Sequence, residues 1–110
     1  MSVLEIPGVV PLSMSAGVNR FGAEDPGWPF MGPPSKKNNR IFTARIEFER
    51  AFANPPIVHL GLTGFDISNG DWARLEVRVG AIDATGFEVI AETWYATQIW
   101  SFRVSWLALG

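Results

Sequence analysis

The chain of 110 residues contains no cysteine and only one histidine. The absence of cysteine excludes disulfide bridges, thiol nucleophiles and cysteine-ligated metals. The histidine, His59, lies inside an apolar run, and alone it builds neither a catalytic triad nor a histidine-rich metal site, since both need converging partners. We therefore interpret His59 as a structural or interface residue, with a pH-sensitive contact as the alternative.

A strong charge of one sign and long hydrophobic runs are also missing. Nine basic and eleven acidic residues give a formal charge of -2, and the one basic cluster, Lys36, Lys37 and Arg40, is interpreted as a solvated loop. No apolar run is long enough to cross a bilayer, and no Sec-type signal peptide is visible. We expect neither nucleic-acid binding nor membrane insertion. The compartment stays open between the cytoplasm and export to the surface or medium by another route.

Paired carboxylates are the remaining route to catalysis, and the acidic residues show no such arrangement. Glu88 and Glu92 share one strand face, but nothing in the pattern marks one as an acid and the other as a nucleophile. Residues 66–71 superficially resemble a calcium loop but lack its ligand spacing and its closing bidentate glutamate. We expect a protein that is not an enzyme and that uses neither a metal nor another cofactor.

What the sequence does contain is short stretches with the two-residue period of half-buried β-strands. These stretches are residues 45–49, 57–62, 74–79, 87–94 and 99–109. Residues 83–86 supply turn chemistry, so the stretch that follows is expected to pair with the one before as a hairpin. No stretch combines sustained helical periodicity with caps. The sequence therefore predicts an all-β fold, an antiparallel β-sandwich.

The chain divides at about residue 40. Glycines and prolines are frequent before that point, and they interrupt helices and long strands. We expect residues 1–39 to form an irregular N-terminal arm with one or two short strands, and residues 40–110 to form the sandwich domain. Phe21, Trp28 and Phe30 are large apolar groups unsuited to a free tail, so the arm is expected to pack on the domain or on a neighbouring subunit.

Five tryptophans are many for a chain of this length. Core packing is the simpler interpretation, and Trp106 is assigned to the core. Aromatic faces also stack against the C–H faces of pyranose rings, and such sites combine an apolar platform with a few fixed hydrogen-bonding groups. Trp94 and Tyr95 lie at one end of a short connection and Trp100 at the other. A shared sugar-binding platform is therefore geometrically reasonable.

Ordered motifs run through the second half of the chain. They are Ile46-Glu47-Phe48, Phe52, Asn54-Pro55-Pro56-Ile57-Val58, Gly61-Leu62, Phe65-Asp66, Arg74-Leu75-Glu76-Val77, Ala84-Thr85-Gly86-Phe87, Thr93-Trp94 and Val104-Ser105-Trp106-Leu107-Ala108. In this order and spacing, residues 38–110 resemble the H-type lectin domain of snail agglutinins and slime-mould discoidins. The resemblance implies a six-stranded antiparallel β-sandwich, usually a trimer or a pair of trimers. It also implies binding of galactose or N-acetylgalactosamine at sites shared between subunits.

The resemblance further implies a set of sugar-binding residues. Arg74 matches the family's binding arginine, whose planar fork presents several donors to sugar hydroxyls. Trp94 matches the tryptophan of the family's Thr-Trp pair. Tyr95 stands in place of a histidine of the snail lectins, and Trp100 in place of a tyrosine. By the resemblance, these side chains pack on the sugar and its N-acetyl group.

The loop before the first matching strand departs from the family's pattern. Lys37 stands where the snail lectins have an aspartate, and Ser35 where they have a glycine. Lysine offers donors only, so it cannot replace a carboxylate acceptor. Two hypotheses follow: a shifted loop uses Asn38 or Asn39 as the acceptor, or an acidic sugar pairs with Lys37.

We expect a multivalent carbohydrate-binding protein, trimeric or hexameric, that takes galactose-type, N-acetylgalactosamine-type or acidic glycans. Linking several weak sites in one oligomer raises the overall affinity for a multivalent glycan. The alternative is a structural module, such as a phage-tail, virion or surface-appendage component, that keeps the fold and has lost the sugar site. The missing aspartate and the apolar arm favour this alternative.

Overall fold

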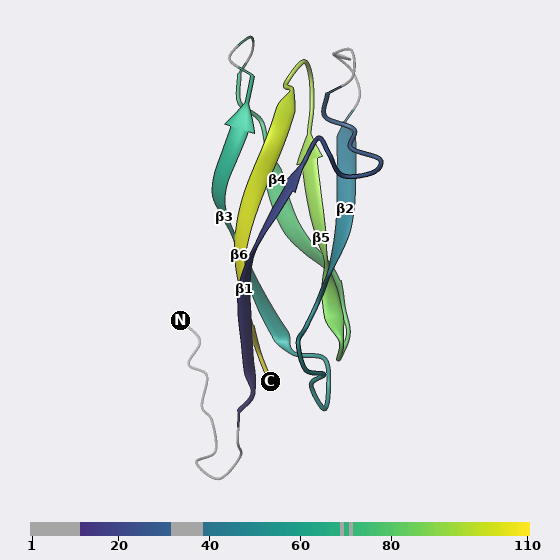
Figure 1. The fold of residues 1–110 in the computed structure, drawn as a ribbon, viewed down its shortest axis with the longest axis vertical. Helices are drawn as coiled ribbons and strands as arrows, with labels where there is room; N and C mark the ends of the chain where they lie inside the picture. Colours follow the sequence, from purple (N-terminus) through teal and green to yellow (C-terminus); the bar gives the residue numbers. More distant parts are fainter. Residues whose placement is uncertain (1–11, 32–38, 69, 71) are drawn as a thin grey trace.

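The computed structural model describes residues 12–31, 39–68, 70 and 72–110 (Figure 1). These residues form six antiparallel strands in two sheets and contain no helix, so none that could span a membrane. The strands are β1 (Met14–Gly22), β2 (Arg40–Glu47), β3 (Ile57–Ile67), β4 (Glu76–Ile82), β5 (Gly86–Thr93) and β6 (Ile99–Leu109). One sheet has the order β1-β6-β3 and the other the order β2-β5-β4. The predicted six-stranded antiparallel sandwich is confirmed.

The strand bounds follow the two-residue period of the sequence, with differences at β2, β3 and β4. β3 starts at Ile57 as expected but runs to Ile67, five residues beyond the expected end. β6 begins and ends where expected, and β5 pairs with β4 as the expected hairpin. β2 starts at Arg40 rather than at residue 45, because Phe42 and Ile46 both point inward while the apolar Ile41 points outward and hides the alternation. β4 starts at Glu76, two residues later than expected, because Arg74 and Leu75 belong to the connection before it.

The segment before residue 40 supplies one strand of the sandwich. β1 pairs antiparallel with β6 over its whole length, from Met14 to Gly22. Gly17 lies under the indole of Trp106, where an added Cβ would come within 2.9 Å of the ring. Trp106 Nε1 donates a hydrogen bond to Asn19 Oδ1 at 2.8 Å. The sandwich of the structure therefore begins at β1, with five of its strands after residue 40.

The core between the sheets contains two aromatic clusters. The lower cluster consists of Phe48, Phe52, Phe87 and Trp106. The upper cluster consists of Phe21, Trp28, Phe30, Phe42 and Phe102. Trp106 is buried, as expected from the sequence. Burying each such ring contributes roughly 1.5–3 kcal/mol, so the two clusters supply much of the stability of this small domain.

The connections between strands gather at two ends of the sandwich. The upper end in Figure 1 carries the β1–β2, β3–β4 and β5–β6 connections, and the lower end carries the β2–β3 and β4–β5 connections. Among the described strand pairs, β4 and β5 alone are hydrogen-bonded neighbours joined directly in the chain. All three upper connections cross from one sheet to the other.

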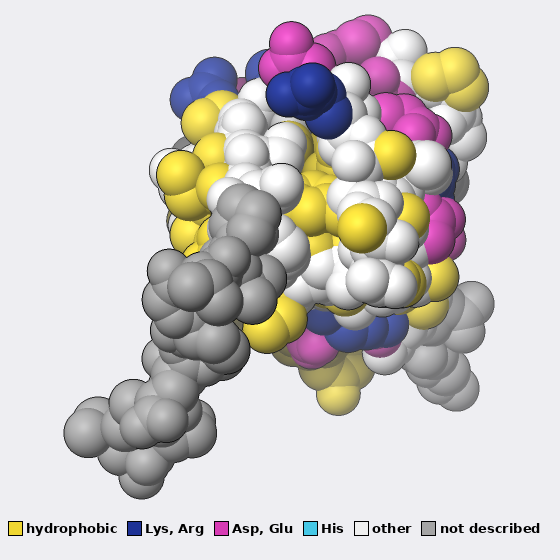
Figure 2. Space-filling model, turned by 90° about the horizontal axis from the view of Figure 1, so that it is seen from below, with side chains coloured by type: hydrophobic (Ala, Val, Ile, Leu, Met, Phe, Trp, Pro, Cys, Tyr) yellow, Lys and Arg dark blue, Asp and Glu magenta, His cyan; other side chains and the backbone are white. Residues whose placement is uncertain are grey.

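At the lower end, the turn of the β4–β5 hairpin is fixed by Asp83. Its Oδ1 accepts hydrogen bonds from the backbone N–H groups of Thr85 (2.8 Å) and Gly86 (3.0 Å), and from Arg45 Nη2 at 3.0 Å. The bond from Arg45, followed by those from Thr85, holds the pKa of Asp83 far below its usual value. Figure 2, which looks at this end from below, shows acidic and basic side chains along one side of it.

Candidate functional site

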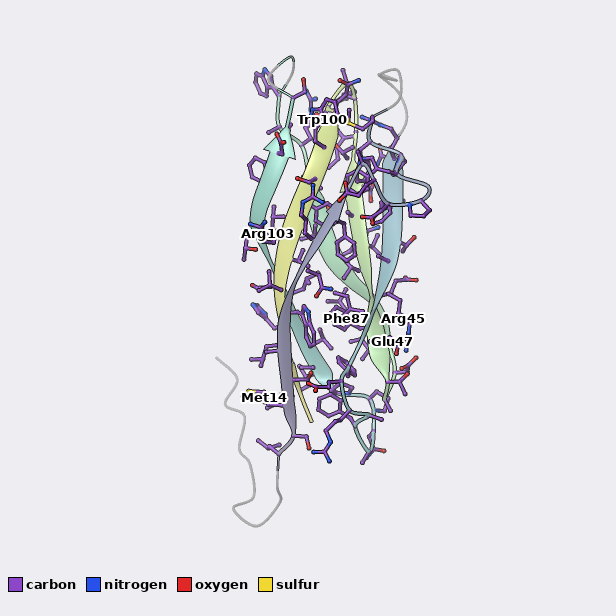
Figure 3. The ribbon with its side chains drawn as sticks, in the orientation of Figure 1. Met14, Arg45, Glu47, Phe87, Trp100 and Arg103 are labelled. Carbon is purple, nitrogen blue, oxygen red and sulfur yellow. The ribbon has the colours of Figure 1, made fainter. Side chains whose placement is uncertain are left out.

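The sequence predicts seven site residues, which in chain order are Ser35, Lys37, Asn39, Arg74, Trp94, Tyr95 and Trp100. Those that the structure describes, from Asn39 onward, lie at the upper end of the sandwich. Ser35 and Lys37 lie outside the described residues. Figure 3 shows Trp100 at the upper end, near the start of β6. Loops that are far apart in the sequence converge at one end of a rigid scaffold, a common place for a binding site.

Arg74 and Tyr95 are in direct contact. The guanidinium carbon of Arg74 lies 5.0 Å from the centre of the Tyr95 ring, a cation–π distance. Tyr95 is 52% exposed and has a φ of 55°, in the left-handed region that a non-glycine residue rarely adopts. A strained backbone thus presents an exposed phenol beside a half-buried guanidinium.

Two buried threonines, which the sequence analysis did not assign to the site, hold Arg74 in place. Thr97 Oγ1 accepts a hydrogen bond from Arg74 Nη1 at 2.9 Å and donates one to the carbonyl oxygen of Trp72 at 2.6 Å. Thr93 Oγ1 donates to the carbonyl oxygen of Arg74 at 2.5 Å. Both threonines are fully buried, so breaking these bonds would leave unsatisfied polar groups in the interior. The β3–β4 and β5–β6 connections are therefore tied together.

Arg40 holds the β5–β6 connection from the other side, which corrects its interpretation as part of a solvated basic loop. Its Nη2 donates to the carbonyl oxygens of Tyr95 (2.7 Å) and Thr97 (2.6 Å). Its Nε and Nη1 are buried and have no hydrogen-bond partner among the described residues. This burial lowers the pKa of Arg40. A partly desolvated guanidinium thus fixes two carbonyls of the connection that carries Tyr95.

Asn39 lies at the edge of the same end. Its Nδ2 donates to Glu92 Oε2 at 2.5 Å, and Arg78 Nη1 lies 2.9 Å from the other carboxylate oxygen. The Asn39 bond first, and then Arg78, lower the pKa of Glu92. The amide oxygen of Asn39 has no partner in the part of the chain that the structure describes, so it remains an available acceptor.

The indoles of this end differ in exposure. Trp94 is half-buried, Trp100 is 49% exposed and Trp72, which the sequence analysis left unassigned, is 80% exposed. Within the described ranges, no ring contact joins Trp94, Tyr95 and Trp100 to one another. The structure therefore brings Arg74 and Tyr95 together, while the expected aromatic platform is not a preformed stack of rings. Neither Trp94 nor Arg74 is sealed in the interior.

Comparison with known proteins identifies one family, two similar solved structures and one relative of similar sequence. The model of the H-type lectin domain family matches residues 43–109. Native recombinant discoidin II of Dictyostelium discoideum has a TM-score of 0.73 at 20% identity over 96% of this chain and 40% of its own. The structure of wild-type discoidin II from the same organism has a TM-score of 0.68 at 22% identity over 89% of this chain and 37% of its own.

A curated protein of Fuscovulum blasticum, called ATP synthase subunits region ORF 7, is 30% identical over 71 residues. That match covers 64% of this chain and 62% of the other protein. The chain thus spans less than two thirds of the length of each of these relatives. The structural likeness establishes a discoidin-like fold.

Proposed function

The chain belongs to the H-type lectin domain family, and from this premise we propose that it binds glycans at the upper end of the sandwich. The observation that carries the proposal is the pair formed by Arg74 and the exposed Tyr95, with Arg74 held by the buried Thr97. A guanidinium in a fixed orientation offers donors to sugar hydroxyls, and the phenol offers an apolar face to the ring. Function as a binding protein without catalysis is part of the proposal.

The proposed contacts divide between stacking and hydrogen bonding. Trp94, Tyr95 and Trp100 supply aromatic faces to the sugar. Arg74 donates to hydroxyls, and the amide oxygen of Asn39 replaces the carboxylate acceptor of the snail lectins. Ser35 and Lys37, from the β1–β2 connection, complete the proposed set. Galactose and N-acetylgalactosamine are the first ligands to consider.

Acidic sugars are the second candidate class. Arg40 and Arg74 both form hydrogen bonds with Thr97, one with its carbonyl oxygen and the other with its hydroxyl. Two guanidinium groups thus contact the same residue, and the positive charge that they bring to this end favours a carboxylate. Galactose and galacturonic acid form a matched pair of probes, since they differ only in the group at C6.

The experiment that tests the proposal is calorimetric titration of the wild type and of Arg74→Gln with N-acetylgalactosamine, galactose and galacturonic acid. Arg74→Gln should weaken binding at least about tenfold, because hydrogen bonds to charged groups contribute about 1.5–3 kcal/mol each. Arg45→Gln is the matched control, since Arg45 lies at the lower end, beside Asp83. A wild type that binds no sugar on a broad glycan array would contradict the proposal, as would equal affinities of wild type and Arg74→Gln.

We also propose that the sites act together in a homotrimer or homohexamer, because linked sites bind a multivalent glycan more tightly than single sites. The small size of the domain supports this proposal, since self-association adds buried surface where disulfide bridges are absent.

The second candidate function is that of a structural module with the lectin fold. The lysine at position 37, in place of an acidic acceptor, favours it. So do exposed apolar side chains of the β1-β6-β3 sheet such as Met14 and Ile57, which lie toward the lower end, away from the proposed glycan site. A protein that assembles but binds none of the sugars above would support this candidate over the lectin. Assembly and sugar binding are therefore measured on the same preparation.

A further inference from the structure

The exposed aromatic side chains of the described residues gather at the upper end of the sandwich. They are Phe65, Trp72, Tyr95 and Trp100, which are between 49% and 80% exposed. Phe65 lies near the end of β3 and Trp100 at the start of β6, and the other two belong to the connections that follow β3 and β5. Figure 1 shows these segments together at the upper end, and Figure 3 labels Trp100 there. Exposed aromatic surface is thus concentrated at the end that carries the Arg74–Tyr95 pair.

Trp72 is the most exposed of these side chains, at 80%, and the contacts proposed above do not use it. A single exposed apolar side chain is common on protein surfaces, so exposure by itself does not identify a binding residue. The position of Trp72 is more informative. It precedes Arg74 by two residues, and two residues of chain span at most about 7 Å. This reach is comparable to the length of one sugar unit in a glycan, so the indole can contact a sugar next to the one that Arg74 binds.

One hydroxyl group fixes Trp72 relative to Arg74. Thr97 Oγ1 donates a hydrogen bond to the carbonyl oxygen of Trp72 at 2.6 Å and accepts one from Arg74 Nη1 at 2.9 Å. Thr97 is fully buried, so losing either bond would leave a polar group unsatisfied in the interior. The backbone that carries the exposed indole is therefore held beside the guanidinium. Binding then requires little ordering of this connection, which lowers the entropic cost of stacking a sugar there.

We propose that Trp72 forms a second sugar subsite, which makes the ligand an oligosaccharide of at least two sugar units. The Arg74–Tyr95 pair binds one unit, and the indole of Trp72 stacks on the C–H face of the neighbouring unit. The inference rests on the glycan-binding function proposed above and names the class of ligand for that site. Covering one face of an indole removes apolar surface from water, so a disaccharide should bind about tenfold more tightly than its monosaccharide.

Phe65 offers the alternative direction for a glycan chain. It is 57% exposed and borders a shallow hollow of about 210 Å³ on the β1-β6-β3 sheet. Its backbone pairs with Phe102 in the ladder of β3 and β6, whereas the backbone of Trp72 is bonded to Thr97, the residue that holds Arg74. The bonds through Thr97 favour Trp72 as the second stacking residue. Phe65 is then the matched control, because it is also an exposed aromatic residue of the same end.

Calorimetric titration with matched sugars tests the second subsite. Lactose, N,N′-diacetyllactosediamine and digalacturonic acid are each compared with their non-reducing monosaccharide, which is galactose, N-acetylgalactosamine or galacturonic acid. Trp72→Ala should remove the gain of about tenfold that the disaccharide has in the wild type, because the stacking surface is lost. It should leave the monosaccharide affinity unchanged, since alanine keeps the backbone carbonyl that Thr97 binds. Trp72→Tyr, which retains an aromatic face, should keep most of the gain, and Phe65→Ala should keep all of it.

Equal affinities of the wild type for disaccharide and monosaccharide would overturn the second subsite and leave the proposed glycan-binding function standing. A Trp72→Ala variant that loses affinity for both sugars alike would contradict a separate subsite, because the indole would then act on the first sugar unit. Loss of the gain in Phe65→Ala, with the gain retained in Trp72→Ala, would place the second unit at Phe65 instead. A wild type that binds none of these sugars contradicts the proposed function, and the inference with it.

Quenching of tryptophan fluorescence by acrylamide measures the contact independently. The emission of Trp72 is obtained as the difference between the wild type and Trp72→Phe, and the high exposure of this indole makes it accessible to the quencher. Saturation with the disaccharide should remove most of the quenching of the Trp72 emission, whereas saturation with the monosaccharide should leave it unchanged. Full quenching of Trp72 while the disaccharide is bound would show that the indole does not touch the ligand, and would overturn the proposal.

Discussion

The two ends of the sandwich are closed in different ways. The lower end is closed by packed rings, including Phe87 and Trp106, and by a turn whose carboxylate, Asp83, is satisfied by backbone N–H groups. The upper end has packed rings as well, but its loops are held by hydrogen bonds from the side chains of Arg40 and Thr97 to loop carbonyls. The lower end follows the rules for a stable fold. The upper end keeps a partly desolvated cation and a left-handed tyrosine, features that proteins retain where geometry serves binding.

The comparison of the two ends leads to a general expectation that experiments can contradict. Substitutions at the lower end should change the free energy of unfolding and leave the sugar affinity of the folded protein unchanged. Substitutions of the polar residues at the upper end should change affinity more than stability.

Phe87→Ala should have the largest effect. Phe87 is fully buried and its ring lies 5.3 Å from that of Trp106, so its truncation should lower the free energy of unfolding by about 3–5 kcal/mol. Urea denaturation followed by tryptophan fluorescence measures the loss. Phe87→Leu is the milder variant to use if the alanine variant does not fold. A weaker affinity of folded Phe87→Leu for N-acetylgalactosamine would break the separation between the two ends.

Arg40→Met should have the opposite effect to Phe87→Ala, lowering the sugar affinity and leaving the stability nearly unchanged. Methionine fills the same space without a buried charge, so the free energy of unfolding should stay within about 1 kcal/mol of the wild-type value or rise. The dissociation constant for N-acetylgalactosamine should rise about tenfold, or 1.4 kcal/mol, because Tyr95 and Thr97 lose the donor that fixes their carbonyls. Hydrogen exchange of the amides of residues 94–98 should be faster. A loss of stability with unchanged affinity and exchange would make Arg40 a residue of the fold alone.

Asp83→Asn should have the smallest effect, a modest loss of stability at neutral pH that disappears in acid. The pKa of Asp83 is lowered in the folded chain, so its stabilising contribution is present above the unfolded value of 3.8 and is lost as the pH falls toward the folded value. The urea concentration at the unfolding midpoint of the wild type should therefore decrease as the pH is lowered below about 4. The midpoint of Asp83→Asn should decrease less steeply over the same pH range. An acid limb of equal slope in both proteins would show that Asp83 does not contribute to the pH dependence.

Most of the fold follows from side-chain alternation, which is why β6 and the β4–β5 hairpin were predicted from the sequence. β1 was harder because Gly17, needed for the approach of the Trp106 ring, and an exposed apolar row at Met14 and Val18 blur its period. Because these apolar residues are exposed, apolar side chains do not mark the buried face of this strand in the sequence.

Candidate site residues could be predicted where residue type carries the chemistry, and not where backbone groups do. Arg74 and Tyr95 were predicted through the family resemblance, and the structure places them in contact. Arg40 and Thr97 act on carbonyl oxygens, which leave no mark in the sequence. One signal was present: Thr93 is the first member of the Thr-Trp pair, and its hydroxyl bonds the backbone of Arg74.

The connectivity described above has a consequence for diversification. The register of a hairpin depends on the length of its turn. Among the described strand pairs, only β4 and β5 at the lower end are joined by such a turn, so only there does the length of a connection determine the register. The upper connections link strands that are not paired, so residues can be added to or removed from them while every ladder of hydrogen bonds keeps its alignment. In such a scaffold the ligand specificity of the upper loops can change in small steps, by natural selection or in loop libraries made in the laboratory. The β4–β5 hairpin at the lower end still sets the strand register.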